Sequence, residues 1–403
     1  MNRNVEQNRM LVEFYDRECL EHVVSLLHRD YPAVTFVYFR HANEPTAQER
    51  KRLSRFVQTA FGVRAQFLEI PENTIDAAAE QFRGLLARCG ACDFDITGGS
   101  SVFIAAAGVL LAEKGRERVS IHEYDVAAGR CLFCSSGEYD PAGETARREL
   151  TVSQTMALRG VQVLNRGEPI RYDLDGDLRR EIRRLWETVR GDLRAWNAFS
   201  VRPAKYTSTW LGLQVEKQMT RRQYESMAPM LKRLSQAQIF TDVQRRDRGE
   251  NVYLSYCLNV PETAQVLYQK GGNLLELLTY LAAADSGRFG DCCTGIKLDW
   301  DDRDAHGSSD PFNELDVVMT GGYIPYFVSC KNTAVENEYL YEIMTMTRHF
   351  GGKYAVPVVA STVENGAVIR ARAKEMGIAL IDGISNMTCE QLTGVLAALA
   401  DRR

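Results

Sequence analysis

The segment Phe94-Asp95-Ile96-Thr97-Gly98-Gly99-Ser100-Ser101 decides the fold of the N-terminal region. A short apolar run at 94–97 enters two glycines and two serines, and an alanine-rich helix is expected to follow at 102–113. Glycines let the backbone turn sharply and approach a ligand, while hydroxyl and N–H groups at a helix start suit a phosphate. An ordinary strand-to-helix turn uses the same residue types. The meaning of the segment therefore depends on its place in the fold.

Apolar runs and amphipathic stretches alternate through residues 1–150. The pattern predicts strands at 10–15, 34–39, 64–70, 94–97 and 118–124, and helices at 17–27, 46–60, 73–88 and 102–113. Such alternation is typical of a parallel sheet with right-handed crossovers and helices on both faces. We expect an α/β, Rossmann-like, doubly wound domain over 1–150.

In open sheets of this kind, ligands bind beyond the carboxyl ends of the strands where the strand order reverses, usually beside the first and fourth strands. The first strand ends in Tyr15-Asp16-Arg17-Glu18, and the fourth enters Thr97–Ser101. We therefore expect an anionic ligand to be bound by Asp16, Arg17, Thr97, Gly98, Gly99, Ser100 and Ser101. The glycine-rich dinucleotide fingerprint and the Walker A loop are both missing from the sequence, which disfavours NAD binding and ATP hydrolysis.

The bulk properties describe an ordinary globular protein. A length of 403 residues exceeds what one hydrophobic core usually supports, so we expect a second domain at 266–403 and a connector at 151–265. No apolar run is long enough to cross a bilayer, and the N-terminus lacks a signal-peptide pattern, so we expect a cytoplasmic protein with no membrane association. In such a compartment the ten cysteines stay reduced.

Two cysteine pairs have the internal spacing of a zinc site. Cys89 and Cys92 form one pair, and Cys131 and Cys134 form the other. The gap between the pairs is longer than a compact zinc ribbon uses, and each pair borders an expected buried strand. Small apolar core residues are therefore the favoured interpretation, with a four-thiolate zinc site as the alternative.

The connector is basic although the whole chain has a net charge of −4. Residues 178–250 contain 16 Lys and Arg against 8 Asp and Glu, a net charge of +8. Helices are expected at 179–196 and 223–239, followed by a hairpin with its tip at 245–250 and a strand at 252–258. A helix followed by a basic hairpin is compatible with a winged helix that attracts a polyanion, and equally with a plain connector.

The C-terminal region contains a second set of charged residues. Glu276 lies among leucines on an expected helix, where a carboxylate is costly to bury unless it is paired or binds a cation. Asp316 and Lys331 lie on the two arms of an expected antiparallel hairpin, formed by 313–319 and 326–331. Carboxylates that hold Mg²⁺ or Mn²⁺ beside an ammonium group meet the needs of metal-assisted phosphodiester hydrolysis.

The remainder of this region again alternates helices and strands. Helices are expected at 336–349 and 367–376, and strands at 355–360 and 378–381. A mixed sheet flanked by helices can keep the hairpin with Asp316 and Lys331 at its centre.

The chain resembles the CRISPR ancillary nucleases in which a CARF domain is fused to a PD-(D/E)xK restriction-endonuclease-like domain. The resemblance covers most of the chain. It is carried by Asp95-Ile96-Thr97-Gly98-Gly99-Ser100, Leu150-Thr151-Val152-Ser153 to Gly160, Gly271-Gly272-Asn273-Leu274-Leu275-Glu276, Asn313-Glu314-Leu315-Asp316 and Val328-Ser329-Cys330-Lys331-Asn332.

The resemblance implies a homodimer that binds a cyclic oligoadenylate, commonly cyclic tetra-adenylate, and then cleaves DNA, RNA or both in type III CRISPR antiviral defence. It assigns Glu276, Asp316 and Lys331 as catalytic residues, with Glu276 and Asp316 as metal ligands. The chain departs from the family at Ser329, where the pattern has an acid. The backbone carbonyl of Cys330, or else Glu314, would then complete the metal shell. The alternative function is a ligand-responsive nucleic-acid-binding regulator without nuclease activity.

Overall fold

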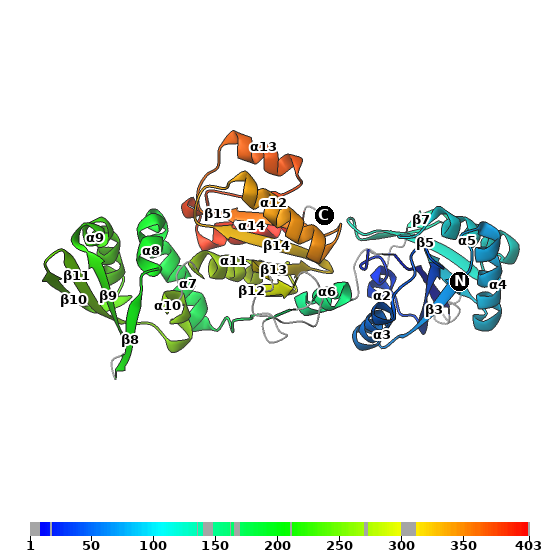
Figure 1. The fold of residues 1–403 in the computed structure, drawn as a ribbon, viewed down its shortest axis with the longest axis horizontal. Helices are drawn as coiled ribbons and strands as arrows, with labels where there is room; N and C mark the ends of the chain where they lie inside the picture. The colour runs from blue at the N-terminus through cyan, green and yellow to red at the C-terminus, as the bar shows by residue number, and fades with distance from the viewer. Residues whose placement is uncertain are drawn as a thin grey trace.

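The computed structural model describes residues 9–401 except 17, 135, 140–147, 162, 165–169, 210–211, 270–272 and 300–311. Three sheets contain all the named strands (Figure 1). In Figure 1 the sheet formed by the C-terminal residues lies between the other two. The fold class is α/β, as the sequence predicts.

The N-terminal sheet has the order β3-β2-β1-β4-β5-β6-β7. Its first five strands are parallel, and β6 and β7 extend it as an antiparallel edge. The strands are β1 (Met10–Phe14), β2 (Ala33–Phe39), β3 (Arg64–Ile70), β4 (Cys92–Asp95), β5 (Val119–Asp125), β6 (Arg130–Phe133) and β7 (Glu138–Tyr139). Because β1 lies between β2 and β4, the strand order reverses where the sequence predicts.

Helices cover both faces of this sheet. Leu11 and Tyr15 pack with residues of α2 (Val24–His28) and α3 (Ala47–Phe61) on one face. Val12 and Phe14 pack with α4 (Ile75–Cys89) and α5 (Ser101–Lys114) on the other. Each face is formed by alternate residues of the central strand, as the two-residue repeat of a strand requires.

The middle sheet is antiparallel, with the order β10-β11-β9-β8. Its strands are β8 (Ala204–Thr209), β9 (Gly212–Thr220), β10 (Phe240–Arg248) and β11 (Asn251–Leu258). One face packs against α7 (Gly176–Val189), α8 (Leu193–Ser200) and α9 (Arg221–Gln236). The turn η1 (Arg190–Asp192) joins α7 to α8, and η2 (Glu262–Ala264) and α10 (Val266–Gln269) follow β11.

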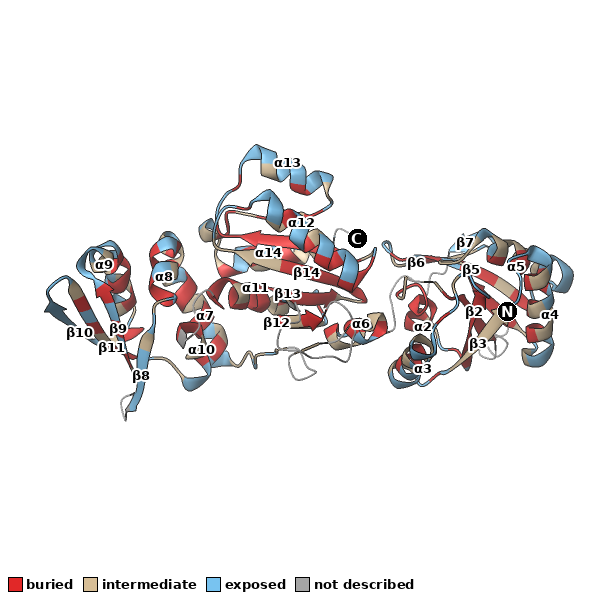
Figure 2. Ribbon diagram, viewed as in Figure 1, coloured by how far each residue is buried: buried red, intermediate tan, exposed pale blue. Residues whose placement is uncertain are grey.

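The C-terminal sheet is mixed, with the order β12-β13-β14-β15-β16. The first three strands are antiparallel and the last three parallel. They are β12 (Asp291–Asp299), β13 (Phe312–Gly321), β14 (Ile324–Lys331), β15 (Val356–Ser361) and β16 (Ala379–Ile381). Figure 2 shows β13 and β14 buried along most of their described length.

Helices also cover both faces of the C-terminal sheet. One face packs against α11 (Asn273–Ser286) and α14 (Cys389–Ala400), which follows the turn η4 (Ile384–Asn386). The other packs against α6 (Val152–Arg159), α12 (Asn337–Met346) and α13 (Ala367–Glu375). A π-helical turn, η3 (Thr347–Gly351), continues α12 directly.

Several expected elements differ in extent. The expected helix at 179–196 breaks at η1, the expected helix at 17–27 is regular only in α2, and β4 ends at Asp95, before Thr97. Arg245 and Arg246 lie on β10, since the hairpin turns at Gly249 and Glu250. The sequence did not predict five elements, because their hydrophobic patterns are weak and their burial depends on partners distant in the sequence. These are strands β8, β9 and β12 and helices α6 and α14.

The two cysteine pairs lie too far apart to share one metal ion. Cys92 pairs with Val119 at the start of β5, whereas Cys131 pairs with Tyr124 near its end. At about 3.3 Å per residue along a strand, that separation excludes a four-thiolate zinc site. Separately, no helix in the described part of the chain is long and apolar enough to cross a membrane.

Candidate functional site

The loop Thr97–Ser101 lies at the switch point between β1 and β4, at the carboxyl ends of the strands. A Cβ atom on Gly98 would lie 2.8 Å from Glu21 Oε2 and 3.2 Å from Asp16 Oδ2. Gly99 has φ +113°, and a Cβ there would approach Phe14 and Phe103. Close packing and the positive φ therefore require a glycine at Gly99, whereas at Gly98 the neighbouring carboxylates would have to move. Ser100 caps α5 by accepting a hydrogen bond from Phe103 N at 3.2 Å.

Thr97 is held in place by the sheet beneath it. Its backbone N–H donates to Asp95 Oδ1 at 2.7 Å, and its hydroxyl hydrogen-bonds the same carboxylate. The backbone N–H of Tyr124 donates to the Thr97 hydroxyl at 2.8 Å. Thr97 therefore fixes the shape of the loop, and the exposed hydroxyl of Ser101 and the first N–H groups of α5 remain the groups that suit an anion.

A buried network continues below Asp95. Ser25 Oγ donates to Asp95 Oδ2 at 2.5 Å and lies 2.8 Å from His122 Nε2, and His122 Nδ1 lies 2.8 Å from Asp93 Oδ1. Tyr31 donates to the second oxygen of Asp93 at 2.8 Å. These distances match a nucleophile, base and carboxylate triad. Ser25 and His122 are fully buried, however, so the network supports the loop and does not expose a nucleophile.

The network holds ionised groups in the interior. Burial disfavours the charged ring of His122, but the carboxylates of Asp93 and Asp95 outweigh this effect and raise its pKa. Burial likewise opposes ionisation of Asp93, yet His122 and Tyr31 hold the pKa of that carboxyl well below its usual range. The raised pKa of His122 and the lowered pKa of Asp93 both indicate an ion pair between the two side chains.

Acidic side chains line the other side of the loop. Asp16 and Glu21 both approach Gly98, and Arg17 lies outside the described residues. Carboxylates repel phosphate but accept hydrogen bonds from ribose hydroxyl groups and similar donors. Glu21 was not identified from the sequence, because nothing in its local pattern distinguishes it from a surface residue.

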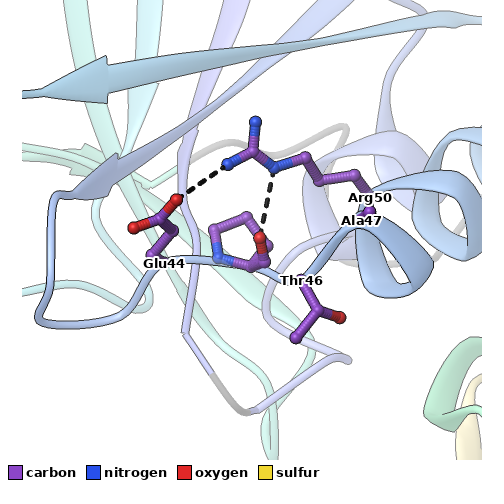
Figure 3. A pocket seen from close by; sticks show the side chains of 5 residues that line it. Glu44, Thr46, Ala47 and Arg50 are labelled. Carbon is purple, nitrogen blue, oxygen red and sulfur yellow. Dashed lines mark hydrogen bonds and ion pairs between the residues drawn. The ribbon is translucent and has the colours of Figure 1, made fainter.

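A hollow of about 500 Å³ lies at the same edge of the sheet, at the start of α3. Arg50 lines it, forms an ion pair with Glu44 at 3.4 Å and donates to the carbonyl of Pro45 at 3.2 Å (Figure 3). Arg50 also donates to the Tyr38 hydroxyl at 2.8 Å. The hollow follows β2, which pairs with β1 on the side away from β4, and its one cation is paired with Glu44.

Asp316 and Lys331 lie where the sequence predicts, on the central hairpin of the C-terminal sheet. The register Val317↔Val328 places Asp316 opposite Ser329. The backbone N–H of Cys330 donates to Asp316 Oδ2 at 2.6 Å. The Lys331 ammonium group lies 4.4 Å from the centre of the Tyr339 ring on α12, a cation–π contact that orients it.

A backbone irregularity accompanies Asp316. The pairs Thr294↔Val317 and Ile296↔Leu315 place Gly295 across from Asp316 on the neighbouring strand. Gly295 has φ +57°. Leu315 and Val318 pack in one core cluster, although strict alternation would put them on opposite faces. The interrupted alternation is a tertiary feature that the sequence pattern does not show.

A cavity of about 40 Å³ lies between this hairpin and α12. Asp316, Lys331, Ser329, Glu314 and Glu342 all line it. Glu342 was not identified from the sequence, because it looks like an ordinary exposed position of an amphipathic helix. The cavity therefore brings one ammonium group together with three carboxylates and the Ser329 side chain.

Glu276 lies on α11, which packs against the other face of the C-terminal sheet. The Cys330 thiol donates a hydrogen bond at 3.8 Å to the hydroxyl oxygen of Thr279, one turn further along α11. Burial raises the pKa of the Cys330 thiol well above its usual range, and Asp316 and Glu276 raise it further. The charges of both carboxylates thus act on Cys330, whereas the cavity beside Asp316 is lined by Lys331 and not by Glu276.

The donor set suits a hard divalent cation. Burial raises the pKa of Asp316, with Glu314 and Glu342 acting in the same direction, against the effects of the Cys330 N–H and Lys331. Among the described residues, no three Asp, Glu, His or Cys side chains form a metal site by themselves. Mg²⁺ commonly takes only one or two carboxylates and completes its shell with water and substrate phosphate. The residues therefore fit such an ion.

No protein-family model matches the sequence, and no curated protein matches it. Among solved structures, protein VC1899 from Vibrio cholerae matches with a TM-score of 0.71 at 15% identity, covering 98% of both chains. Can2 from Sulfobacillus thermosulfidooxidans, solved with cyclic tetra-adenylate, matches with a TM-score of 0.63 at 15% identity and the same coverage.

A type III CRISPR defence DNA nuclease activated by cyclic oligoadenylate matches with a TM-score of 0.50 at 16% identity. The match covers 93% of this chain and 50% of that one. The chain therefore has the fold of these proteins along nearly its whole described length.

Proposed function

We propose that this protein is a metal-dependent nuclease of type III CRISPR defence, activated by a cyclic oligoadenylate. The observation that carries the proposal is the cavity beside the β13–β14 hairpin, where Asp316 and Lys331 lie with Glu342 of α12. The fold shared with Can2 and with a cyclic-oligoadenylate-activated DNA nuclease supports it.

Cyclic tetra-adenylate is the proposed activator, and the loop Thr97–Ser101 with Asp16 and Arg17 is its proposed site. The start of α5 would bind phosphate, and Asp16 would accept hydrogen bonds from ligand hydroxyl groups. A two-fold symmetric ring suits a homodimer, since a two-fold interface presents the same loop from both chains. The proposed domains are 1–150 for sensing, 151–265 as connector and 266–403 for cleavage.

In the cleavage site, Asp316 and Glu276 would hold Mg²⁺ or Mn²⁺, together with the carbonyl of Cys330. Glu314 and Glu342 are the other carboxylates within reach. The bound ion would polarise the phosphate and lower the pKa of a water molecule. Asp316 is fixed by the N–H of Cys330, and Lys331 is positioned by Tyr339 to stabilise charge that develops on the phosphate.

A cleavage assay tests the proposal. The purified protein is incubated with single-stranded and duplex DNA and with RNA, in Mn²⁺ or Mg²⁺, over a panel of cyclic oligoadenylates. We expect cyclic tetra-adenylate to stimulate cleavage, and Asp316→Asn and Lys331→Met each to reduce it by about 10²-fold or more. Lys374→Met, at an exposed position of α13, is the matched control for lysine loss.

Asp316→Asn also separates catalysis from folding. Because burial and the nearby carboxylates of Glu314 and Glu342 raise the pKa of Asp316, its replacement by a neutral isostere should leave the melting temperature unchanged or raise it. Full cleavage activity in both Asp316→Asn and Lys331→Met would refute the proposed site.

The second candidate function is a ligand-responsive nucleic-acid-binding regulator. Ser329, in place of an acid, and the exposed arginines of β10 favour it. Duplex binding that depends on ligand and salt, with no cleavage of any substrate in Mn²⁺, would establish the regulator and exclude the nuclease.

A further inference from the structure

The segment after β1 connects the proposed activator loop directly to the C-terminal sheet. Glu21 is 3% exposed and its two oxygens face different parts of the molecule. Oε1 accepts a hydrogen bond from the Tyr354 hydroxyl at 2.6 Å and forms an ion pair with Lys353. Oε2 faces Gly98, where an added Cβ would lie 2.8 Å away. One carboxylate thus contacts both regions.

A second acidic residue strengthens the same connection. Glu18 forms an ion pair with Arg159 at 2.8 Å and accepts a hydrogen bond from the backbone N–H of Lys353 at 3.2 Å. Gly352 has φ +81°, and a Cβ there would lie 2.3 Å from Glu18 Oε1 and 2.5 Å from Arg159 Nη1. The segment after β1 and the turn at Gly352 therefore lie in close contact, and the positive φ of Gly352 favours a glycine there.

The contacted residues immediately follow the helix that lines the cleavage site. Gly352 separates Lys353 and Tyr354 from η3, which continues α12 without a break. Glu342 and Met346 of α12 line the cavity beside Asp316 and Lys331. A π-helical turn in such a helix is a frequent mark of a functional position. A shift of Lys353 and Tyr354 would therefore act on the wall of the cleavage site.

We propose that Glu21 is an inhibitory latch: its contact with Lys353 and Tyr354 restrains the η3–α12 segment, and an activator at Gly98 releases it. This inference rests on the proposed function and names its regulation. A phosphate beside Gly98 brings negative charge next to Glu21 Oε2, and like charges at such distances repel. Binding and the latch contact therefore oppose each other, and by linkage the loss of the contact strengthens binding.

The test removes the C-terminal half of the latch and leaves the activator loop and the cleavage site unchanged. The variants are Tyr354→Phe, Lys353→Gln and their double mutant. Tyr341→Phe, 53% exposed on α12, and Lys374→Gln, exposed on α13, make the same chemical changes elsewhere. Cleavage is measured over a range of cyclic tetra-adenylate concentrations, and binding of the same ring is measured in an Asp316→Asn background.

Without activator, we expect the double mutant to cleave at least about fivefold faster than wild type. It should also reach half-maximal cleavage at an activator concentration about fivefold lower. Its affinity for cyclic tetra-adenylate should rise by a similar factor, with both control variants unchanged. In wild type, activator should also speed hydrogen exchange of the amides of 347–354, because the latch opens.

The outcomes separate this inference from the proposed function. A wild-type protein that neither binds the ring nor cleaves nucleic acid would refute the proposed function. A wild-type protein activated by the ring, with a double mutant that has an unchanged or higher activator requirement, would refute the latch alone. Slower hydrogen exchange of 347–354 on binding would also contradict the release of the contact.

Discussion

At the scale of single residues, the buried pair His122 and Asp93 supports the loop proposed to bind the activator. His122 connects through Ser25 to Asp95, which in turn holds Thr97. A charged pair in the interior is costly to break, because the remaining charge loses its partner without regaining water. The loop is therefore fixed by buried polar groups beneath it.

The pair predicts a pH dependence of local stability. The pKa of His122 is raised, so its contribution is complete below pH 6.5 and is lost as pH rises through the raised pKa. The pKa of Asp93 is lowered, so its contribution is lost only below pH 3.8. Hydrogen exchange of β4 and β5 amides should therefore show decreasing protection from neutral to alkaline pH.

Substitution tests the same pair. His122→Gln should destabilise β4 and β5 by about 3–5 kcal/mol at pH 6 and abolish the alkaline decrease in protection. Asp93→Asn should also abolish it, since the imidazolium then loses its carboxylate. A variant that keeps the wild-type pH profile would show that another group titrates.

At the scale of elements, the middle sheet presents an open face that carries cations and an aromatic ring. Arg246 and Arg248 are exposed on β10, and Arg248 lies 5.5 Å from the ring centre of Tyr253 on β11. Tyr253 is 38% exposed and pairs with Arg246 in the register of the two strands. Arginine beside an exposed aromatic ring is typical of surfaces that bind single-stranded nucleic acid.

We expect this face to hold the substrate. In an Asp316→Asn background, Arg246→Gln and Arg248→Gln should each weaken nucleic-acid binding and reduce the salt dependence by about one unit of slope. Arg245→Gln is the control, because Arg245 is paired with Asp247 and lies over Tyr224 on the other face. Equal effects of all three variants would exclude a role for this particular face.

At the scale of the whole molecule, some helices that join the three sheets pack against more than one domain. Leu158 of α6 packs in the cluster that contains α3, whereas Val152 and Met156 pack against the C-terminal sheet. The helix therefore contacts both the N-terminal domain and the C-terminal sheet, and its Arg159 forms an ion pair with Glu18 beside the Glu21 contact. Packed helices and ion pairs of this kind can carry energetic coupling between two proposed sites that are distant from each other.

The proposed homodimer predicts a binding stoichiometry. One ring of cyclic tetra-adenylate should bind per two chains, because each chain would present one copy of the Thr97–Ser101 loop to the ring. Light scattering gives the mass of the protein and calorimetry gives the molar ratio. A ratio of one ring per chain would exclude a shared two-fold site.

The sequence by itself determined the elements whose periodicity is local. The alternation of strands and helices at 10–124 predicted the parallel sheet and its switch point, and the hairpin of Asp316 and Lys331 was predicted from two apolar runs around a glycine turn. These patterns suffice because hydrophobic periodicity and turn residues act over a few positions.

Only the tertiary structure decided which distant side chains face one another. Glu342 lines the cavity beside Asp316, and Glu21 joins Gly98 to Tyr354, although each reads locally as an ordinary polar position. It also separated the two cysteine pairs along β5, excluding a shared metal site. The physical reason is the same in each case: charge and coordination act through space, across sheet partners and packed helices that no local sequence period encodes.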